Sequence, residues 1–452
     1  MNLEQLRKRA KDLVRDERAG DSDALARFAA HHPHATGPRK LADAQLVVAR
    51  EQGFPSWPRL KGYLDRLAAH GDDLQFAYHA ELDYYDGRAY GLLASGRDAT
   101  PGAREPFDRN GAPLTHGGAR LVVARAHGFA SWAALRRHVA GLAASGEPFA
   151  VAYRAVEARD AGRLGAVLDR WPDVVHHQGT NGNDLLGMAT ATGSTATTTL
   201  LLERGADPSH PNVHGWTPLH QTAYSDQPRL ARLLLEHGAD PGAFARGDGG
   251  TPLVAALFWG NRGVADLLVE RAGVLPRNLR AAAGAGDLAL VHELAGTPAA
   301  GAHRGFYRPH SGFPEWTPSD DTQEVLDEAF CWAARSDRAE VLEPLVGRGA
   351  RLEADVYRGT ALAWAAVNGC LASLRVLLAL GADPSGRTTF GGPDHGSEAT
   401  PLHLAAQNGR RDAVLHLLEA GADRHAVDGI HGGTPAGWAQ FCGHPDVAEL
   451  LG

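Results

Sequence analysis

The stretch GWTPLHQTAYSDQPRLARLLLEHGADPGA, residues 215–243, carries the signals of two helices joined by a tight turn. Thr217 is placed to begin the first helix, and Pro218 falls in its first turn, where the missing N–H costs nothing. Small residues such as Ala223 let two helices approach closely, and the GAD at 238–240 ends the second helix and turns the chain outward. One such helical pair cannot bury its own apolar face, so the sequence predicts that further copies stack against it.

The two halves of this stretch recur through most of residues 181–452. The related segment GGTPLVAAL begins at Gly249, 34 residues after Gly215 (249 − 215 = 34). The remaining copies of the first half begin at Gly359, Ala399 and Gly433, and those of the second half at Leu200, Pro344, Val376 and His416. A period in this range is the signature of stacked structural repeats.

The motif T-P-L-H-x-A-A, followed by L-L-x-x-G-A-D, resembles the ankyrin repeat. The resemblance implies an all-α fold, an ankyrin-type α-solenoid of stacked helix–turn–helix repeats with short hairpin loops. It also implies that His220 and His403, at the H of the motif, hydrogen-bond the backbone of the adjoining loops. The general function that it implies is that of a protein-binding scaffold.

The first third of the chain contains a different duplication. LVVAREQGFPSWPRL at 46–60 reappears as LVVARAHGFASWAAL at 121–135. Gly53 and Gly128 follow a helical pattern at the position where a glycine in the left-handed region ends a helix, and Ser56 is placed to begin the next one. The two copies share no catalytic pattern, so the duplication predicts a helix–turn–helix unit without chemistry of its own.

Similar G-F-x-S-W segments precede bacterial ankyrin arrays, and the chain resembles a bacterial ankyrin-repeat protein with such N-terminal modules. We interpret 1–70 as a helical-pair module and 71–147 as its diverged second copy, both capping or extending the solenoid. Repeats are expected over 148–296 and 324–452, the last one truncated, with an aromatic Gly/Pro-rich insertion at 297–323. The expected repeats are 149–180, 181–212, 213–246, 247–274, 275–296, 324–355, 356–390, 399–433 and 434–452.

Charge and composition exclude several classes of function. The chain has 45 Lys and Arg residues against 53 Asp and Glu, a formal net charge of −8, which argues against a protein that tracks nucleic-acid phosphates. No apolar run reaches the roughly 18 residues of a spanning helix, and the charged N-terminal segment lacks the apolar core of a signal peptide. Three widely spaced cysteines indicate neither a disulfide framework nor a metal knuckle. We therefore expect a cytoplasmic monomer that binds a protein partner and neither nucleic acid nor a membrane.

Catalytic and cofactor-binding motifs are absent from the sequence. It lacks nucleotide-binding loops, zincin motifs, GxSxG elbows and deaminase signatures, so we predict no catalytic residue and no cofactor. Histidines gather in several polar loops, but no Cys or regularly spaced carboxylate joins them, and we predict that they bind no metal. These histidines are His31, His32, His34, His176, His177, His210, His214, His303 and His310.

Aromatic residues recur at fixed positions of the repeats. The x of T-P-L-H-x-A-A, which we expect on the concave side, is Trp332, Trp364 or Trp438 in three of the last four repeats. The two residues after A-A tend to face the same side. Such rings either pack beneath neighbouring loops or form a stripe for a partner, since Trp and Tyr are enriched at binding hot spots. The predicted partner-binding residues are Trp216, Tyr224, Phe258, Trp259, Trp332, Trp364 and Trp438, with Tyr307 and Trp316 from the insertion.

Two hypotheses for the function follow. The first is a binding scaffold that recognises a protein partner through its concave face and the 297–323 insertion. The alternative is an enzyme or small-ligand-binding protein, with a pocket built by the insertion and the adjacent aromatic groove. The repeat scaffold and the lack of a catalytic motif favour the first, and the length of the insertion favours a functional role for it under both.

Overall fold

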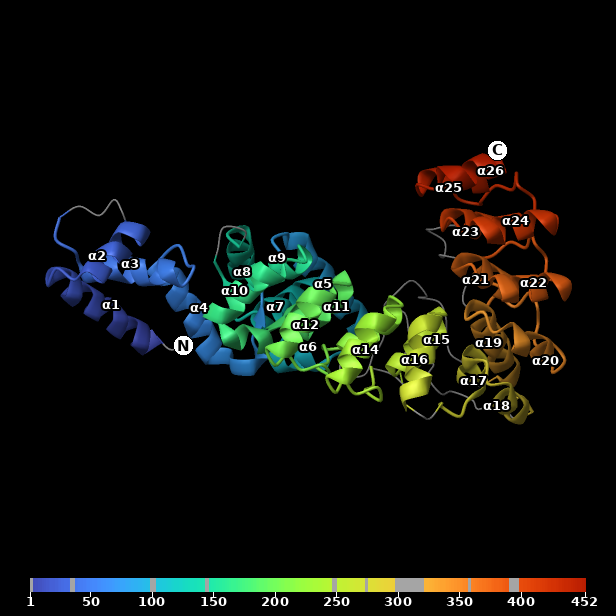
Figure 1. Ribbon diagram of the computed structural model, residues 1–452, viewed down its shortest axis with the longest axis horizontal. Coiled ribbons are helices and arrows are strands. Elements are labelled where there is room, and N and C mark those ends of the chain that lie inside the picture. The colour runs from blue at the N-terminus through green and yellow to red at the C-terminus, as the bar shows by residue number, and fades with distance from the viewer. Residues whose placement is uncertain are drawn as a thin grey trace. The chain divides into compact units, whose positions relative to one another are not determined.

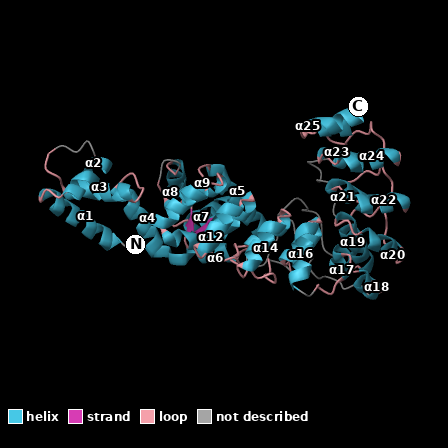
Figure 2. Cartoon of the chain, viewed as in Figure 1, coloured by secondary structure: helices cyan, strands magenta, loops and turns pink. Residues whose placement is uncertain are grey.

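The computed structural model describes residues 3–32, 37–97, 103–142, 146–245, 250–272, 275–296, 321–356, 359–389 and 398–452. The chain forms two compact units, Met1–His214 and Gly215–Gly452, each with its own internal packing. Nearly all regular structure in the described ranges is helical (Figure 1, Figure 2), and none of these helices is long and apolar enough to cross a membrane. The predicted all-α repeat fold is confirmed.

The duplicated stretch of the first unit builds the same turn twice, between α3 and α4 and between α7 and α8. Gly53 and Gly128 have φ angles of 87° and 73°, the left-handed conformation that the sequence predicts. The amide of Phe54 donates to the carbonyl of Ala49, and that of Gly53 to the carbonyl of Arg50, both at 2.9 Å, as in a Schellman motif. These bonds fix the direction in which the second helix leaves the turn. The helices in this part of the unit are α1 (Leu3–Arg18), α2 (Ser22–His31), α3 (Leu41–Glu51), α4 (Trp57–His70), α5 (Leu82–Arg97), α6 (Glu105–Asn110), α7 (His116–Ala126) and α8 (Trp132–Ala140).

A short parallel strand pair, not predicted from the sequence, joins two distant parts of the first unit (Figure 2). Strand β1 (Gln75–Phe76) pairs with β2 (Gln178–Gly179). The ring of Phe76 also stacks on Phe149 at 5.8 Å and on His177 at 4.4 Å between centroids. The segment between the two copies of the duplicated stretch is thereby packed on the first repeats. The remaining elements of the unit are η1 (Gly71–Asp73), α9 (Pro148–Glu157), α10 (Ala161–Arg170), η2 (Pro172–His176), η3 (Thr180–Gly182), α11 (Leu185–Thr192) and α12 (Thr195–Glu203).

The second unit is a stack of helical pairs, and the first helices of successive pairs lie side by side. Figure 1 shows α19, α21, α23 and α25 in one column and α20, α22, α24 and α26 in the next. The pairs before them are α13 (Pro218–Tyr224) with α14 (Pro228–Glu236), α15 (Pro252–Trp259) with α16 (Arg262–Ala272), and α17 (Leu279–Ala285) with α18 (Leu288–Leu294). The later elements are α19 (Thr322–Arg335), η5 (Ala339–Val341), α20 (Leu342–Val346), α21 (Ala361–Asn368), α22 (Leu371–Ala379), α23 (Pro401–Gln407), α24 (Arg411–Glu419), α25 (Pro435–Phe441) and α26 (Pro445–Leu451).

The two histidines of the T-P-L-H motif tie helices α13 and α23 to the hairpins that follow them, as predicted. The ring of His220 accepts from the Thr217 amide at 3.2 Å through Nδ1 and lies 2.9 Å from the Gly250 carbonyl through Nε2. His403 makes the corresponding contact to the Gly433 carbonyl at 3.0 Å. Because the carbonyl can only accept, Nε2 carries the proton in both rings. At these two junctions, neighbouring repeats are therefore held in register by hydrogen bonds as well as by apolar contacts.

Helix α19 is buried along most of its length, and two of its acids are paired. Every residue from Val325 to Arg335 is buried. Glu328 forms an ion pair with Arg280 of α17 inside the core. Asp327 accepts from the Arg351 guanidinium at 2.6 and 2.8 Å and from the Arg351 amide at 2.8 Å. The pairing of both acids allows carboxylates to sit in a core helix without an uncompensated charge.

Candidate interaction surface

Three aromatic side chains from two successive repeats form one exposed group, called here the aromatic surface: Trp216, Tyr224 and Trp259. Trp216 precedes α13, Tyr224 ends α13, and Trp259 ends α15. The ring of Tyr224 lies edge-on to Trp259 at 5.4 Å and to Trp216 at 6.3 Å between centroids. Tyr224 is 49% exposed, and both tryptophans are half-buried. The prediction of aromatic residues accessible to a partner therefore fits these three positions.

The backbone beneath the aromatic surface is held by the next repeat. The side-chain amide of Asn261, just after α15, donates to the carbonyls of Ala223 and Tyr224 at 2.8 and 2.7 Å. These are carbonyls at the end of α13 that the helix itself leaves without partners. Asn261 thus fixes the end of α13 beside the end of α15. The rings of Tyr224 and Trp259 stand on a rigid base as a result.

His220 supports the same surface from within the unit. Its ring lies 5.1 Å from the Trp216 ring and is completely buried. Burial lowers the pKa of His220 to about 4, although its contact with the Gly250 carbonyl acts in the opposite direction. The imidazole beneath Trp216 is therefore neutral at pH 7.

Three of the predicted partner-binding residues are buried, and for them the prediction is wrong. Phe258, Trp332 and Trp364 are only 1%, 1% and 4% exposed. The ring of Phe258 lies 5.8 Å from Trp332, and both Phe258 and Trp364 pack on the guanidinium of Arg335, at 4.4 and 4.6 Å from its carbon. We call these four residues the arginine core. Trp332 and Trp364, at the x position of the motif, face into the stack and cannot contact a partner.

The arginine core forms because the ends of α15, α19 and α21 converge. Arg335 at the end of α19 donates to the carbonyl of Phe258 at the end of α15. The side chain of Asn368, which ends α21, donates to the carbonyls of Trp259 and Arg335 at 3.0 Å each. A cation at helix C-termini is favourable because their carbonyls carry partial negative charge. Nothing in the motif marked Arg335 as a buried residue, so sequence reasoning missed this site.

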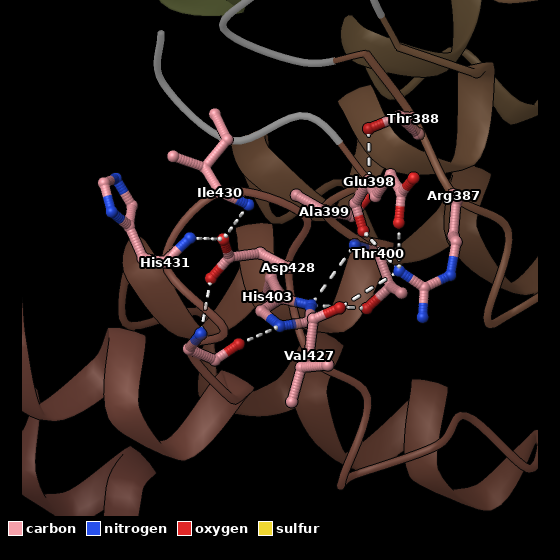
Figure 3. Close-up of polar contacts among 11 residues, drawn as sticks. Arg387, Thr388, Glu398, Ala399, Thr400, His403, Val427, Asp428, Ile430 and His431 are labelled. Atoms are coloured by element: carbon pink, nitrogen blue, oxygen red, sulfur yellow. Dashed lines mark hydrogen bonds and ion pairs between the residues drawn. The ribbon is translucent and has the colours of Figure 1, made fainter. Parts of the chain in front are cut away.

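A second exposed group lies at the hairpin tip before α25 (Figure 3). Asp428 accepts from the amides of Ile430, His431 and Gly433 at 2.7–2.9 Å and from the indole N–H of Trp438 at 3.0 Å. Burial raises the pKa of this carboxyl, but the four donors outweigh it and hold the pKa well below its usual range. The tip is therefore closed around the ionised carboxylate of Asp428.

The closed tip presents apolar side chains outward. Val427 and Ile430 of the tip are exposed, and Phe441 at the other end of α25 is 92% exposed. Trp438 is half-buried, with its ring 5.2 Å from His403. In Figure 3, Arg387 joins the neighbouring tip by donating to the carbonyl of Val427 at 3.0 Å and to the Glu398 carboxylate at 3.0 Å. Asp428 was also missed, although an Asp before Gly is a usual sign of a side-chain-closed turn.

Some predicted residues lie outside the described ranges, and others have separate roles. Tyr307 and Trp316 fall outside, as do residues 297–320 of the insertion. His32 pairs with Asp43 at 3.3 Å, and His210 lies 3.1 Å from the Gly182 carbonyl. Within the described ranges, no group of three His, Cys, Asp or Glu side chains is placed to hold a metal ion.

Comparison with known families agrees with the repeat fold. A family model described as ankyrin repeats in three copies matches residues 167–245 and also 186–278, and a model of the single ankyrin repeat matches residues 397–429. The chain is an ankyrin-repeat protein. The second match contains the aromatic surface, and the third contains His403 and Asp428. Repeats of this family serve as protein-interaction scaffolds, so the architecture supports protein binding in general. The bacterial origin and the role of the N-terminal modules stay predictions.

Proposed function

We propose that this ankyrin-repeat protein binds a protein partner through the aromatic surface, with the 297–323 insertion contributing to the same interaction. The observation that carries the proposal is that Tyr224 contacts both Trp216 and Trp259 while all three rings remain partly exposed. Scattered exposed apolar residues need no explanation, but a contiguous group supported from beneath does. Trp and Tyr are also the residues that contribute most at binding hot spots.

The surroundings of the aromatic surface support a partner with an apolar group at its centre. Ser225 and Asp226 are exposed next to Tyr224, and Gln221 donates to the Ser225 hydroxyl at 3.2 Å. An aromatic centre with a polar rim is the usual organisation of a protein interface. Because Asn261 already orders the end of α13, binding loses little further conformational entropy there.

The test is differential capture with the full chain immobilised. Host lysate is passed over the parent, over Tyr224→Ser and over Phe244→Ser, and the bound proteins are quantified by mass spectrometry. Phe244 is the matched control because it is 65% exposed and is not part of the aromatic surface. A protein retained by the parent and the control but lost from Tyr224→Ser supports the proposal. With the captured protein purified, Tyr224→Ser should weaken the binding free energy by about 2 kcal/mol.

The outcome against the proposal is equally definite. If every captured protein binds Tyr224→Ser as well as the parent, the aromatic surface is not the interface. A deletion of residues 300–316 tests the insertion separately. The deletion should reduce the binding free energy for the same partner by more than it reduces the free energy of unfolding of the chain.

A further inference from the structure

A pocket of about 330 Å³ lies in the first unit, between the two copies of the duplicated stretch. Residues 75 positions apart (129 − 54 = 75) line it from both copies: Phe54 and Phe129 follow the two left-handed glycines. The copies differ where they carry charge. Arg59 in one copy corresponds to Ala134 in the other, and Gly62 corresponds to Arg137. Each copy thus contributes one guanidinium where the other leaves space.

The floor of the pocket is a buried ionic group. Glu147 is 3% exposed and accepts from the Arg66 guanidinium at 3.0 and 3.1 Å. His138 Nε2 lies 3.3 Å from Oε2 of the same carboxylate. The Arg66 guanidinium also packs over the Phe129 ring at 4.9 Å. Arg66 and Glu147 therefore satisfy each other and hold one aromatic wall in place.

In the described part of the chain, the guanidinium groups of Arg59 and Arg137 have no such partner. Arg59 and Arg137 are exposed, and within the described residues neither forms a hydrogen bond or ion pair. Arg59, Arg66, Arg137 and Glu147 of the lining together carry a net charge of +2 (3 − 1 = 2). A concave site with uncompensated positive charge attracts anions. Guanidinium groups bind carboxylates and phosphates in particular, because their donors match two oxygens.

Gly62 leaves part of the pocket lining without a side chain. It lies inside helix α4, where glycine is less stable than alanine by about 0.5–1 kcal/mol. A Cβ at Gly62 would meet no atom within 4 Å, so no close backbone contact requires glycine there. The missing side chain leaves this part of the pocket open.

We infer that this pocket binds a small organic anion, with a carboxylate or phosphate held by Arg59 and Arg137 and an apolar ring or short chain between Phe54 and Phe129. A volume of about 330 Å³ is at the lower end of ligand sites, which suits a molecule of metabolite size. The inference concerns a different unit from the aromatic surface and does not depend on the protein-binding proposal.

The experiment measures binding to the full chain by calorimetry and by the shift in melting temperature. The probes are phenyl phosphate and phenylacetate, with inorganic phosphate and benzyl alcohol as the charge-only and ring-only controls. One organic anion should bind saturably at one site and raise the melting temperature, because it binds only the folded state. Equal effects from inorganic phosphate or from benzyl alcohol would overturn the inference, as would no binding by either organic anion.

Variants locate the site. Arg137→Gln should weaken the affinity for the anion by about tenfold or more, since one charge-assisted hydrogen bond is lost. Gly62→Leu should fill the pocket and abolish binding while the melting temperature of the free protein stays level or rises. Gly87→Leu is the matched control, because Gly87 is also inside a helix with no atom near its missing Cβ, but away from the pocket. Undiminished binding by Gly62→Leu and Arg137→Gln would place the anion elsewhere and reject the pocket.

Discussion

The aromatic surface and the arginine core share one repeat position, directly after the A-A pair, yet the first faces solvent and the second is closed. Trp259 ends α15 half-buried, whereas its neighbour Phe258 is 1% exposed beneath Arg335. Tyr224 and Arg335 both occupy the position directly after the A-A pair of their repeats. Tyr224 is exposed and Arg335 is fully buried. The environment of a repeat position is thus decided by which helix ends meet there, rather than by its place in the motif.

The largest effect should come from truncating a ring of the arginine core. Trp332→Ala removes a fully buried ring between α15 and α17 and should lower the free energy of unfolding by about 3–5 kcal/mol. Urea denaturation followed by circular dichroism measures this. Trp259→Ala is the same chemical change on the aromatic surface and should cost less than half as much. Equal losses in the two variants would mean that the two environments do not differ.

Acid should affect the base of the aromatic surface more than the arginine core. His220 is neutral in the folded state, with a pKa of about 4 against 6.5 when unfolded. The unfolded chain therefore binds more protons between these values, and stability falls as the pH drops from about 6.5 towards 4. Arg335 does not titrate in this range, so the arginine core has no such dependence.

The pH effect is measured as a difference between two proteins. Between pH 7.5 and pH 5, the parent should lose about 2 kcal/mol more stability than His220→Asn, which cannot titrate. Other buried histidines contribute equally to both proteins and cancel. Identical pH profiles for parent and variant would show that His220 is already protonated or solvated in the folded protein.

The two regions also mark what the sequence could and could not predict. The pattern T-P-L-H, the Thr caps and the turn glycines act within one repeat or between neighbours, and the helices they predict are present. The contact from Arg335 to Phe258 spans 77 residues (335 − 258 = 77) and depends on the convergence of three helix ends. No local pattern encodes such a meeting, so the burial of Trp332 and Trp364 was predicted wrongly.

The first unit shows the same limit. The Schellman turns at Gly53 and Gly128 were predictable because each is a local arrangement of a few residues. The strand pair of Gln75–Phe76 with Gln178–Gly179 is too short to leave an alternating pattern. The anion pocket likewise depends on two copies of one stretch facing each other, which their sequence identity alone does not reveal.

A smaller effect is expected within the aromatic surface itself. Tyr224→Ser removes two edge-on ring contacts from a half-exposed site and should cost about 1 kcal/mol of unfolding free energy. Thermal or urea denaturation of the purified variant measures it. A loss as large as that of Trp332→Ala would make Tyr224 a core residue and remove the basis for using it as a binding probe.

The smallest effect should be at Phe441, which occupies the motif position of Tyr224 in the repeat of α25. Its ring is 92% exposed, while α25 is anchored by Ala439, which is fully buried. Phe441→Ser should therefore change the free energy of unfolding by no more than about 0.5 kcal/mol, as for other surface substitutions. Trp332, Tyr224 and Phe441 then form a series of rings from one repeat pattern. The loss of unfolding free energy on removing each ring should follow its burial. A loss above about 1 kcal/mol in Phe441→Ser would show that this ring packs on the protein in solution, and the order of the series would break.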